Sequence, residues 1–143
     1  MRKVLLIALC CLACAKPVPK NDLTIGGKAR ARVIVMTEAL ATKEGGPKET
    51  VAAFGEVYAF SPDTIPLHRD EPTEIVFWNL QSDDEHDFML LNDRNAVLTK
   101  FKLPPLKKTT VVFTFHRDGI YRFVCTLHQP EMSGAITVAP PAL

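Results

Sequence analysis

Short apolar segments that recur between turn-forming residues constrain the fold of this chain most strongly. After residue 24, runs rich in Val, Phe, Thr and Ile alternate with clusters of Pro, Gly, Asn and Asp, without a long amphipathic helix. This pattern is typical of an all-β protein. We therefore predict a Greek-key antiparallel β-sandwich of seven to eight strands. The segments expected to form strands are 29–36, 51–60, 74–80, 87–91, 96–103, 109–115, 119–125 and 134–138.

The first residues of the chain are typical of an export signal. Residues 1–3 are a Met followed by two basic residues, and residues 4–13 form an apolar run. That run is much shorter than the roughly 20 residues that a membrane-spanning helix needs. We predict an export signal over residues 1–15, a linker over 16–23 and a single domain over 24–143, a size that can bury its own core.

Two processing routes fit this signal. The sequence CLAC of residues 11–14 resembles a lipoprotein signal, in which Cys14 becomes the lipidated first residue. The sequence ACA of residues 13–15 is also a small-x-small site, which would be cut before Lys16 to give a soluble product. We prefer the lipoprotein route. Either route places the domain in the periplasm or at the outer face of a membrane, and only the lipoprotein route gives it a membrane contact, through the lipid anchor.

Cysteine usage singles out one thiol. Of the four cysteines, three belong to the signal or its boundary, and only Cys125 remains in the predicted domain. An exported domain meets oxidising conditions, where a lone thiol is expected to be buried, catalytic or bound to a metal. Cys125 therefore needs a specific explanation, and a buried structural thiol is the simplest one.

The charged and polar residues exclude several classes of function. The chain has 17 Lys and Arg against 16 Asp and Glu, so no strong positive field would attract nucleic acid or an anionic membrane. No Ser, His and Asp arrangement, carboxylate pair or phosphate-binding loop stands out. Four histidines are too few to build the several metal centres of an oxygen-reducing enzyme. We therefore predict that the protein is not an enzyme.

The segment from Cys125 to Met132 reads CTLHQPEM and directly follows a predicted strand. It places a thiol, an imidazole and a thioether close together, at Cys125, His128 and Met132. Sulfur ligands select Cu(I), imidazole suits both oxidation states of copper, and two His with one Cys and a weak axial Met form the blue-copper electron-transfer site. Such a site needs one more histidine. His86 is placed to supply it, because it lies at the start of another predicted strand.

With these motifs the sequence resembles the cupredoxin family, which includes plastocyanin, amicyanin, azurin and pseudoazurin, over roughly residues 24–138. The resemblance rests on WNL before EHDF, on the strand YRFVC, and on the loop CTLHQPEM running into GAITV. It implies one type 1 copper ion, with His86, Cys125 and His128 in the trigonal plane and Met132 axial. It also implies a monomer that carries single electrons between redox partners such as a cytochrome or a membrane oxidase or reductase.

Asp87 departs from the family pattern. It follows the first ligand histidine, where many family members have an Asn whose hydrogen bonds hold the ligand loop. We expect Asp87 to bond Thr126 in the same role. Its negative charge is expected to stabilise Cu(II) and so to lower the reduction potential.

An acidic cluster precedes and faces the ligand loop, and it has two interpretations. It would steer a basic partner such as a cytochrome, or it is simply a solvated loop. Its members are Asp83, Asp84, Glu85, Asp87 and Glu131.

Other uses of the same copper site remain open at this stage. A delivery or sequestration protein would use the same fold with an exchangeable ion, and an accessory module would serve a membrane oxidase or reductase complex. The axial position is also open, because Gln129 or a backbone carbonyl would replace Met132 if the loop folds differently.

Overall fold

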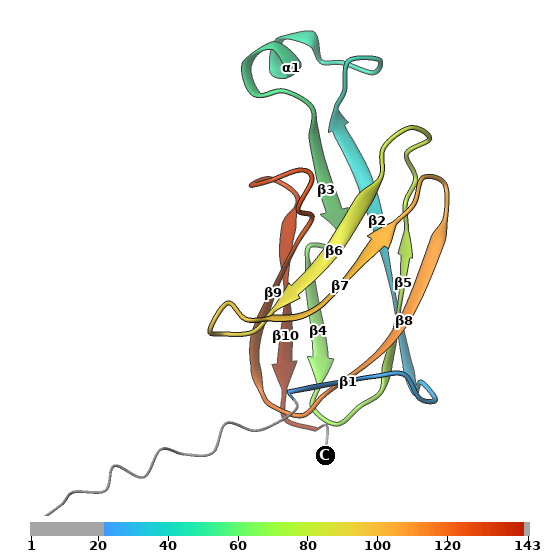
Figure 1. The fold of residues 1–143 in the computed structure, drawn as a ribbon, viewed down its shortest axis with the longest axis vertical. Coiled ribbons are helices and arrows are strands. Elements are labelled where there is room, and N and C mark those ends of the chain that lie inside the picture. The colour runs from blue at the N-terminus through green and yellow to red at the C-terminus, as the bar shows by residue number, and fades with distance from the viewer. Residues whose placement is uncertain (1–21, 142–143) are drawn as a thin grey trace, which may run out of the picture.

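A computed structural model describes residues 22–141, which form two five-stranded sheets packed face to face (Figure 1). The predicted export signal, its Cys14 and most of the predicted linker lie outside these residues. The strand order is β1-β8-β5-β2-β3 in the first sheet and β4-β10-β9-β6-β7 in the second. The elements are β1 (Leu23–Ile25), β2 (Ala31–Ala41), α1 (Lys48–Phe54), β3 (Val57–Ser61), β4 (Thr64–His68), β5 (Thr73–Trp78), β6 (His86–Leu91), β7 (Val97–Leu103), β8 (Lys108–Phe115), β9 (Gly119–Val124) and β10 (Ser133–Ala139).

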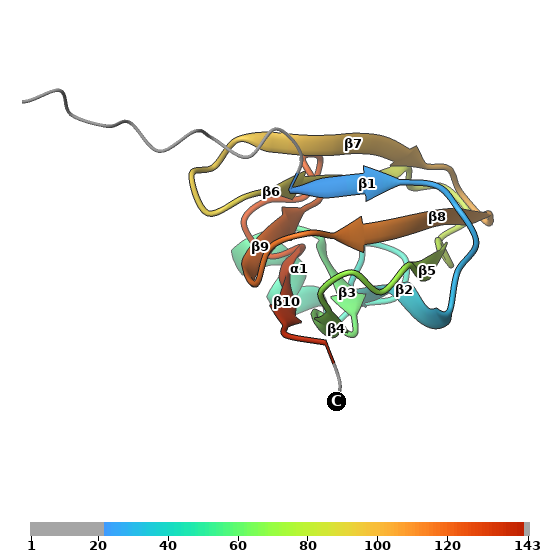
Figure 2. The same ribbon diagram turned by 90° about the horizontal axis from the view of Figure 1, so that it is seen from below.

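The predicted all-β sandwich is confirmed, with ten strands among the described residues where seven to eight were expected. Both sheets are mixed rather than antiparallel throughout, because β2 pairs with β5 and β4 pairs with β10 in parallel. Side chains alternate between the two faces of a strand whether its neighbour is parallel or antiparallel. The sequence pattern therefore cannot reveal the direction of pairing. Figure 2 shows the same fold from below, with β1 beside β8 at the edge of the first sheet. Among residues 22–141, no helix is long and apolar enough to cross a membrane.

The expectation of one strand over residues 51–60 is wrong in its first half. Residues 48–54 form α1, which begins after Pro47 and ends at Gly55, and only Val57–Ser61 forms a strand. Gly55 has a φ of 81°, a conformation that suits glycine at the end of a helix. A short apolar run such as residues 51–54 fits a helix as well as a strand, and none of the residues of α1 is buried.

Strand β4 was missed because it contains Pro66, which argues against a central strand. In the structure β4 lies at the edge of the second sheet. No strand pairs with its open side, so proline, which has no N–H, is tolerated there. Strand β1 was also missed. It begins at Leu23, inside the segment predicted as a linker, and pairs with β8.

Aromatic side chains fill the space between the two sheets. The Phe88 ring of β6 lies 5.1 Å from that of Phe123 on β9 and 4.7 Å from that of Phe77 on β5, measured between ring centroids. All three side chains are buried, and each contributes roughly 1.5–3 kcal/mol by leaving water. Phe77 belongs to the first sheet and the other two to the second. Their contact therefore packs the two sheets against each other near β6.

The pairing of β6 with β9 brings two distant parts of the sequence to one end of the sandwich. The strands are antiparallel, and Met89 pairs with Val124. The start of β6 therefore lies beside the end of β9, and the loop between β9 and β10 leaves the sheet at the same end (Figure 1). The first residue of β6 is His86, and the first residue after β9 is Cys125.

Candidate metal centre

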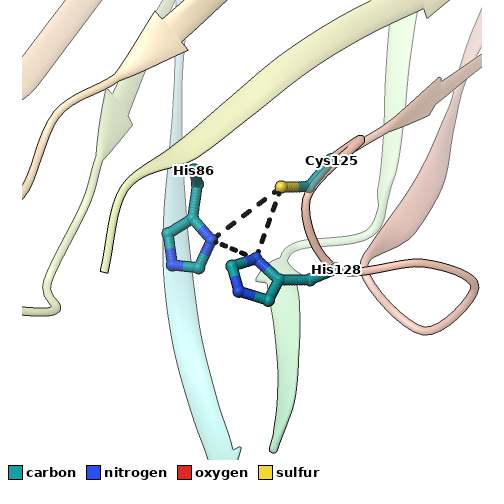
Figure 3. Close-up of side chains that lie close together, drawn as sticks. All are labelled: His86, Cys125 and His128. Atoms are coloured by element: carbon teal, nitrogen blue, oxygen red, sulfur yellow. Dashed lines mark hydrogen bonds between the residues drawn. The ribbon is translucent and has the colours of Figure 1, made fainter. Parts of the chain in front are cut away.

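Three side chains that can bind a metal meet at this end of the sandwich (Figure 3). His86 comes from the start of β6, Cys125 from the end of β9, and His128 from the loop that follows. His86 and Cys125 are fully buried, whereas His128 is half-buried. Tyr121 and Phe123 of β9 and Cys125, the first residue after it, are all buried, as the predicted alternation indicated, so the strand directs the thiol inward.

The donor atoms converge on one point. The Nδ1 atoms of His86 and His128 lie 3.0 Å apart, and the Sγ atom of Cys125 lies 3.9 Å from the first and 3.6 Å from the second. A point equidistant from the three atoms is about 2.1 Å from each, close to the roughly 2.0–2.1 Å of a zinc–imidazole bond. The spacing of the three atoms therefore suits a single metal ion.

The state of His86 also suits a metal ligand. Burial, with a smaller contribution from the neighbouring His128, lowers the pKa of His86 to about 4. The imidazole is therefore neutral at pH 7. Its Nε2 atom lies 2.9 Å from the amide oxygen Oε1 of Gln81, which can only accept a hydrogen bond. The proton is thus held on Nε2, and the lone pair of Nδ1 faces the centre of the site.

Burial raises the pKa of the Cys125 thiol. The backbone N–H of Asp87 opposes this effect, since it lies 3.4 Å from Sγ and donates to it. A thiolate in this position still requires a positive charge nearby, and a bound metal ion deprotonates a coordinating thiol.

Met132 closes the loop that carries Cys125 and His128. Its carbonyl oxygen accepts the N–H of Cys125 at 2.9 Å, and its own N–H donates to the carbonyl of His128 at 3.0 Å. The Met132 side chain is fully buried within the core cluster. The donor set of two imidazoles, one thiolate and one thioether at this site fits one type 1 copper ion.

The comparisons with known proteins agree with this arrangement. The family model of the cupredoxin-like domain matches residues 5–138. The chain belongs to the cupredoxin family. No curated protein sequence matches it significantly.

Solved structures of two auracyanins and an amicyanin have a similar fold. Auracyanin B is 17% identical with a TM-score of 0.56, over 80% of this chain and 93% of its own. Auracyanin A, a "blue" copper protein from Chloroflexus aurantiacus, is 14% identical with a TM-score of 0.55, over 76% of this chain and 98% of its own. Amicyanin from Paracoccus versutus is 15% identical with a TM-score of 0.54, over 84% of this chain and 100% of its own.

In this cupredoxin, Asp87 and Thr126 bond each other directly behind the site. The carboxylate of Asp87 accepts the backbone N–H of Thr126 at 2.5 Å and also accepts its hydroxyl proton. Burial alone would raise the pKa of Asp87, but the two bonds from Thr126 and the ammonium group of Lys100 lower it overall. The carboxylate is therefore ionised, although Asp87 is only 4% exposed.

Three of the five acidic residues near the ligand loop bond residues that are distant in the sequence. Asp87 contacts Lys100, Glu85 lies 2.9 Å from Lys102, and Asp84 accepts the hydroxyl of Tyr58 at 2.5 Å. Asp83 accepts a hydrogen bond from its neighbour Ser82 at 3.3 Å, and both Asp83 and Glu131 are exposed. The cluster is therefore not a free negative surface of five charges, and its capacity to steer a basic partner is smaller than the sequence suggested.

Gln81, Tyr58 and Lys100 contact the site or its supports and were not predicted. The Tyr58 ring packs 4.5 Å from that of His128 and 5.1 Å from that of His86, between centroids. Tyr58 lies on β3 of the other sheet, so only the packing of the sandwich brings it to the imidazoles. Its inward position in an alternating strand is the single sequence signal that would have drawn attention to it.

Proposed function

We propose that this cupredoxin is an exported, mononuclear type 1 copper protein that carries single electrons between redox partners. His86, Cys125, His128 and Met132 would hold the ion. The observation that carries the proposal is the convergence of two imidazole nitrogens and one thiol sulfur on a buried point, with a buried Met in the same loop.

Bound copper would supply a one-electron couple, in which Cu(II) takes up one electron to become Cu(I) and later releases it. The residues of the chain suit both states, since sulfur ligands favour Cu(I) and imidazole binds either. His86 and Cys125 are fixed by adjacent strands of one sheet, and two backbone hydrogen bonds close the loop to Met132. Ligands held this rigidly move little when the charge on the ion changes, which favours fast electron transfer.

The surface next to His128 offers a contact for a partner protein. Leu127 precedes this half-buried histidine and is 54% exposed, and Pro130 follows it at the surface. An apolar rim around a ligand imidazole would let a redox protein approach the copper closely. Such a partner would be a cytochrome or a membrane oxidase or reductase.

A spectroscopic experiment tests the copper site. The purified protein and a Cys125→Ser variant are each loaded with Cu(II) and compared by visible absorption and EPR. An intense thiolate-to-copper charge-transfer band with a narrow copper hyperfine splitting, both lost in the variant, would establish the site. A pale spectrum that is the same in both proteins would overturn the proposal.

A second experiment separates an electron carrier from a copper-delivery protein. The copper-loaded protein is reduced, challenged with a Cu(I) chelator and then reoxidised. Because the thiol of Cys125 and the side chain of Met132 are fully buried, we expect the ion to stay bound through repeated cycles. Ready loss of Cu(I) to the chelator would favour delivery or sequestration instead.

We also propose that residues 1–15 direct export and that Cys14 becomes lipidated, which would hold the domain at the outer face of a membrane. The alternative is a soluble periplasmic protein cut before Lys16. Mass spectrometry of the mature N-terminus distinguishes the two. A lipid-bearing Cys14 would support the anchor, and a free N-terminus at Lys16 would rule it out.

A further inference from the structure

A polar cluster lies on the outer face of the second sheet, directly behind the metal ligands. His86 and Cys125 are fully buried. Asp87 follows His86 in β6, so its side chain points to the opposite face of the strand, and Thr126 follows Cys125 in the loop and bonds Asp87. The cluster is completed by Lys100 of β7, the edge strand beside β6. Asp87 therefore comes from β6, Lys100 from β7 and Thr126 from the ligand loop.

Lys100 bonds both other members of this cluster. Its Nζ atom lies 3.0 Å from Oδ2 of Asp87 and 2.9 Å from Oγ1 of Thr126. Asp87 in turn bonds the backbone and hydroxyl of Thr126, and its own N–H donates to Sγ of Cys125. One ammonium group is therefore linked through a single residue both to the ligand loop and to the ligand sulfur.

The charges in this cluster oppose each other in their effect on a copper ion. A buried carboxylate next to the site favours Cu(II), the more positive state, and so lowers the reduction potential. Asp87 is only 4% exposed, so solvent screens its charge weakly. Lys100 sits on the carboxylate oxygen itself, and so offsets most of that charge.

We propose that Lys100 is a positioning residue that neutralises Asp87 and holds it against the ligand loop, and so keeps the reduction potential higher than the carboxylate alone would allow. This inference rests on the proposed type 1 site. In this chain the Asp87–Lys100 ion pair would replace the neutral Asn that many family members have after the first ligand histidine. It also revises the expectation that Asp87 simply lowers the potential.

The test compares the reduction potentials of two charge-loss variants, Lys100→Met and Lys102→Met. Lys102 is the matched control. It lies two residues away on the same face of β7 and is paired with Asp87 in the strand register, but its ammonium group bonds Glu85. We expect Lys100→Met to lower the potential by an amount that corresponds to about a tenfold change in the Cu(II) to Cu(I) ratio, about 59 mV. Lys102→Met should change this ratio about threefold or less.

Two further variants show whether Lys100 acts through Asp87. In an Asp87→Asn background, Lys100→Met should shift the potential no more than Lys102→Met does, since the carboxylate that it positions is gone. Lys100→Arg keeps the charge and should restore a potential near that of the wild type. The width of the copper hyperfine splitting should follow the same order, because a loosened loop alters the geometry at Cys125.

Each outcome is decisive. Equal shifts in Lys100→Met and Lys102→Met would overturn the inference, and so would a large shift that persists in the Asp87→Asn background. Either result, obtained with a wild-type protein that shows the thiolate-to-copper band, leaves the proposed function intact. A wild-type protein without that band would overturn the proposed function and this inference together.

Discussion

The Nε2 atom of His86 lies 2.9 Å from the amide oxygen of Gln81, whereas its Nδ1 atom faces Cys125 and His128. The two ring nitrogens thus have different neighbours, and an acceptor occupies the side away from the site. The amide of Gln81 is itself held by Thr37, whose carbonyl accepts its Nε2–H at 3.3 Å. Thr37 of the first sheet therefore holds Gln81, and Gln81 sets the orientation and tautomer of His86, which belongs to the second sheet.

Gln81→Ala should weaken copper binding without removing a ligand. Loss of the acceptor frees the His86 ring to rotate and to exchange tautomers, and removal of such an orienting group typically costs about 10–100-fold in metal affinity. The affinity is measured by competition with a chelator.

Gln129→Ala is the control, because Gln129 is exposed in the ligand loop. This variant should bind copper as the wild type does. Equal affinities in the two variants would contradict this role for Gln81.

Gly134→Ala should destabilise the fold strongly. A Cβ atom at Gly134 would lie 2.1 Å from the carbonyl oxygen of Asp63 and 2.3 Å from Cζ of Phe123. The carbonyl cannot move away easily, because it accepts the N–H of Ala135 at 2.8 Å. Overpacking of this kind costs about 1–3 kcal/mol, and contact with backbone places it at the upper end. Urea unfolding of the metal-free protein measures the loss.

Gly45→Ala is the matched control for this prediction. The nearest atom to its added Cβ is the side-chain oxygen of Thr42 at 3.0 Å, in an exposed loop where a side chain can shift. We expect a change of less than about 0.5 kcal/mol, as for most surface substitutions. Similar losses for both variants would show that the tight contact at Gly134 is relieved by movement of β9 or β10.

The fold was largely predictable because most strands carry their own signal. In β9, Tyr121 and Phe123 alternate with the exposed Arg122, and this alternation reveals a strand with one buried face. The strand predictions failed where the local sequence pattern does not match the position of the segment in the folded sheet. Pro66 lies in an edge strand whose position only the assembled sheet defines, and the apolar residues 51–54 form a helix that no core covers.

The proposed ligands could be picked out from their chemistry in the sequence, but the residues that support them could not. Cys125, His128 and Met132 share one short segment, so their donor types are visible together in the sequence. Gln81 and Lys100 are ordinary polar residues, and their contacts depend on strand register and on the packing of two sheets. Such contacts have no local sequence signature.

Met132→Leu should leave the fold intact and raise the reduction potential. Leu and Met are similar in volume, so replacement at this fully buried position should cost less than about 1.5 kcal/mol. Although sulfur as a ligand type suits Cu(I), Cu(I) also tolerates fewer donors than Cu(II) does, so loss of the weak fourth donor destabilises Cu(II) more. Axial ligands tune the potential of blue-copper sites in this way. Redox titration of the copper-loaded variant measures the shift. An unchanged potential with an intact charge-transfer band would show that Met132 is packing and not a ligand.

The hydroxyl of Tyr58 should contribute more to stability than that of Tyr121. Tyr58 donates to the carboxylate of Asp84 at 2.5 Å, whereas Tyr121 donates to the backbone carbonyl of Arg117 at 2.9 Å. Burial and the bond to Asp84 both raise the pKa of Tyr58, so its hydroxyl remains a donor. A bond to a charged acceptor is worth about 1.5–3 kcal/mol and a neutral one about 1 kcal/mol.

Tyr58→Phe should therefore lower the free energy of unfolding more than Tyr121→Phe does, in urea titrations of the metal-free proteins. Tyr58→Ala should cost about 3–5 kcal/mol, because it also removes the ring that packs on both ligand histidines. Since Phe keeps that ring, the copper band should survive in Tyr58→Phe and weaken in Tyr58→Ala. Equal losses for the two Phe variants would mean that the Asp84 carboxylate gains a compensating bond to solvent when the hydroxyl is removed.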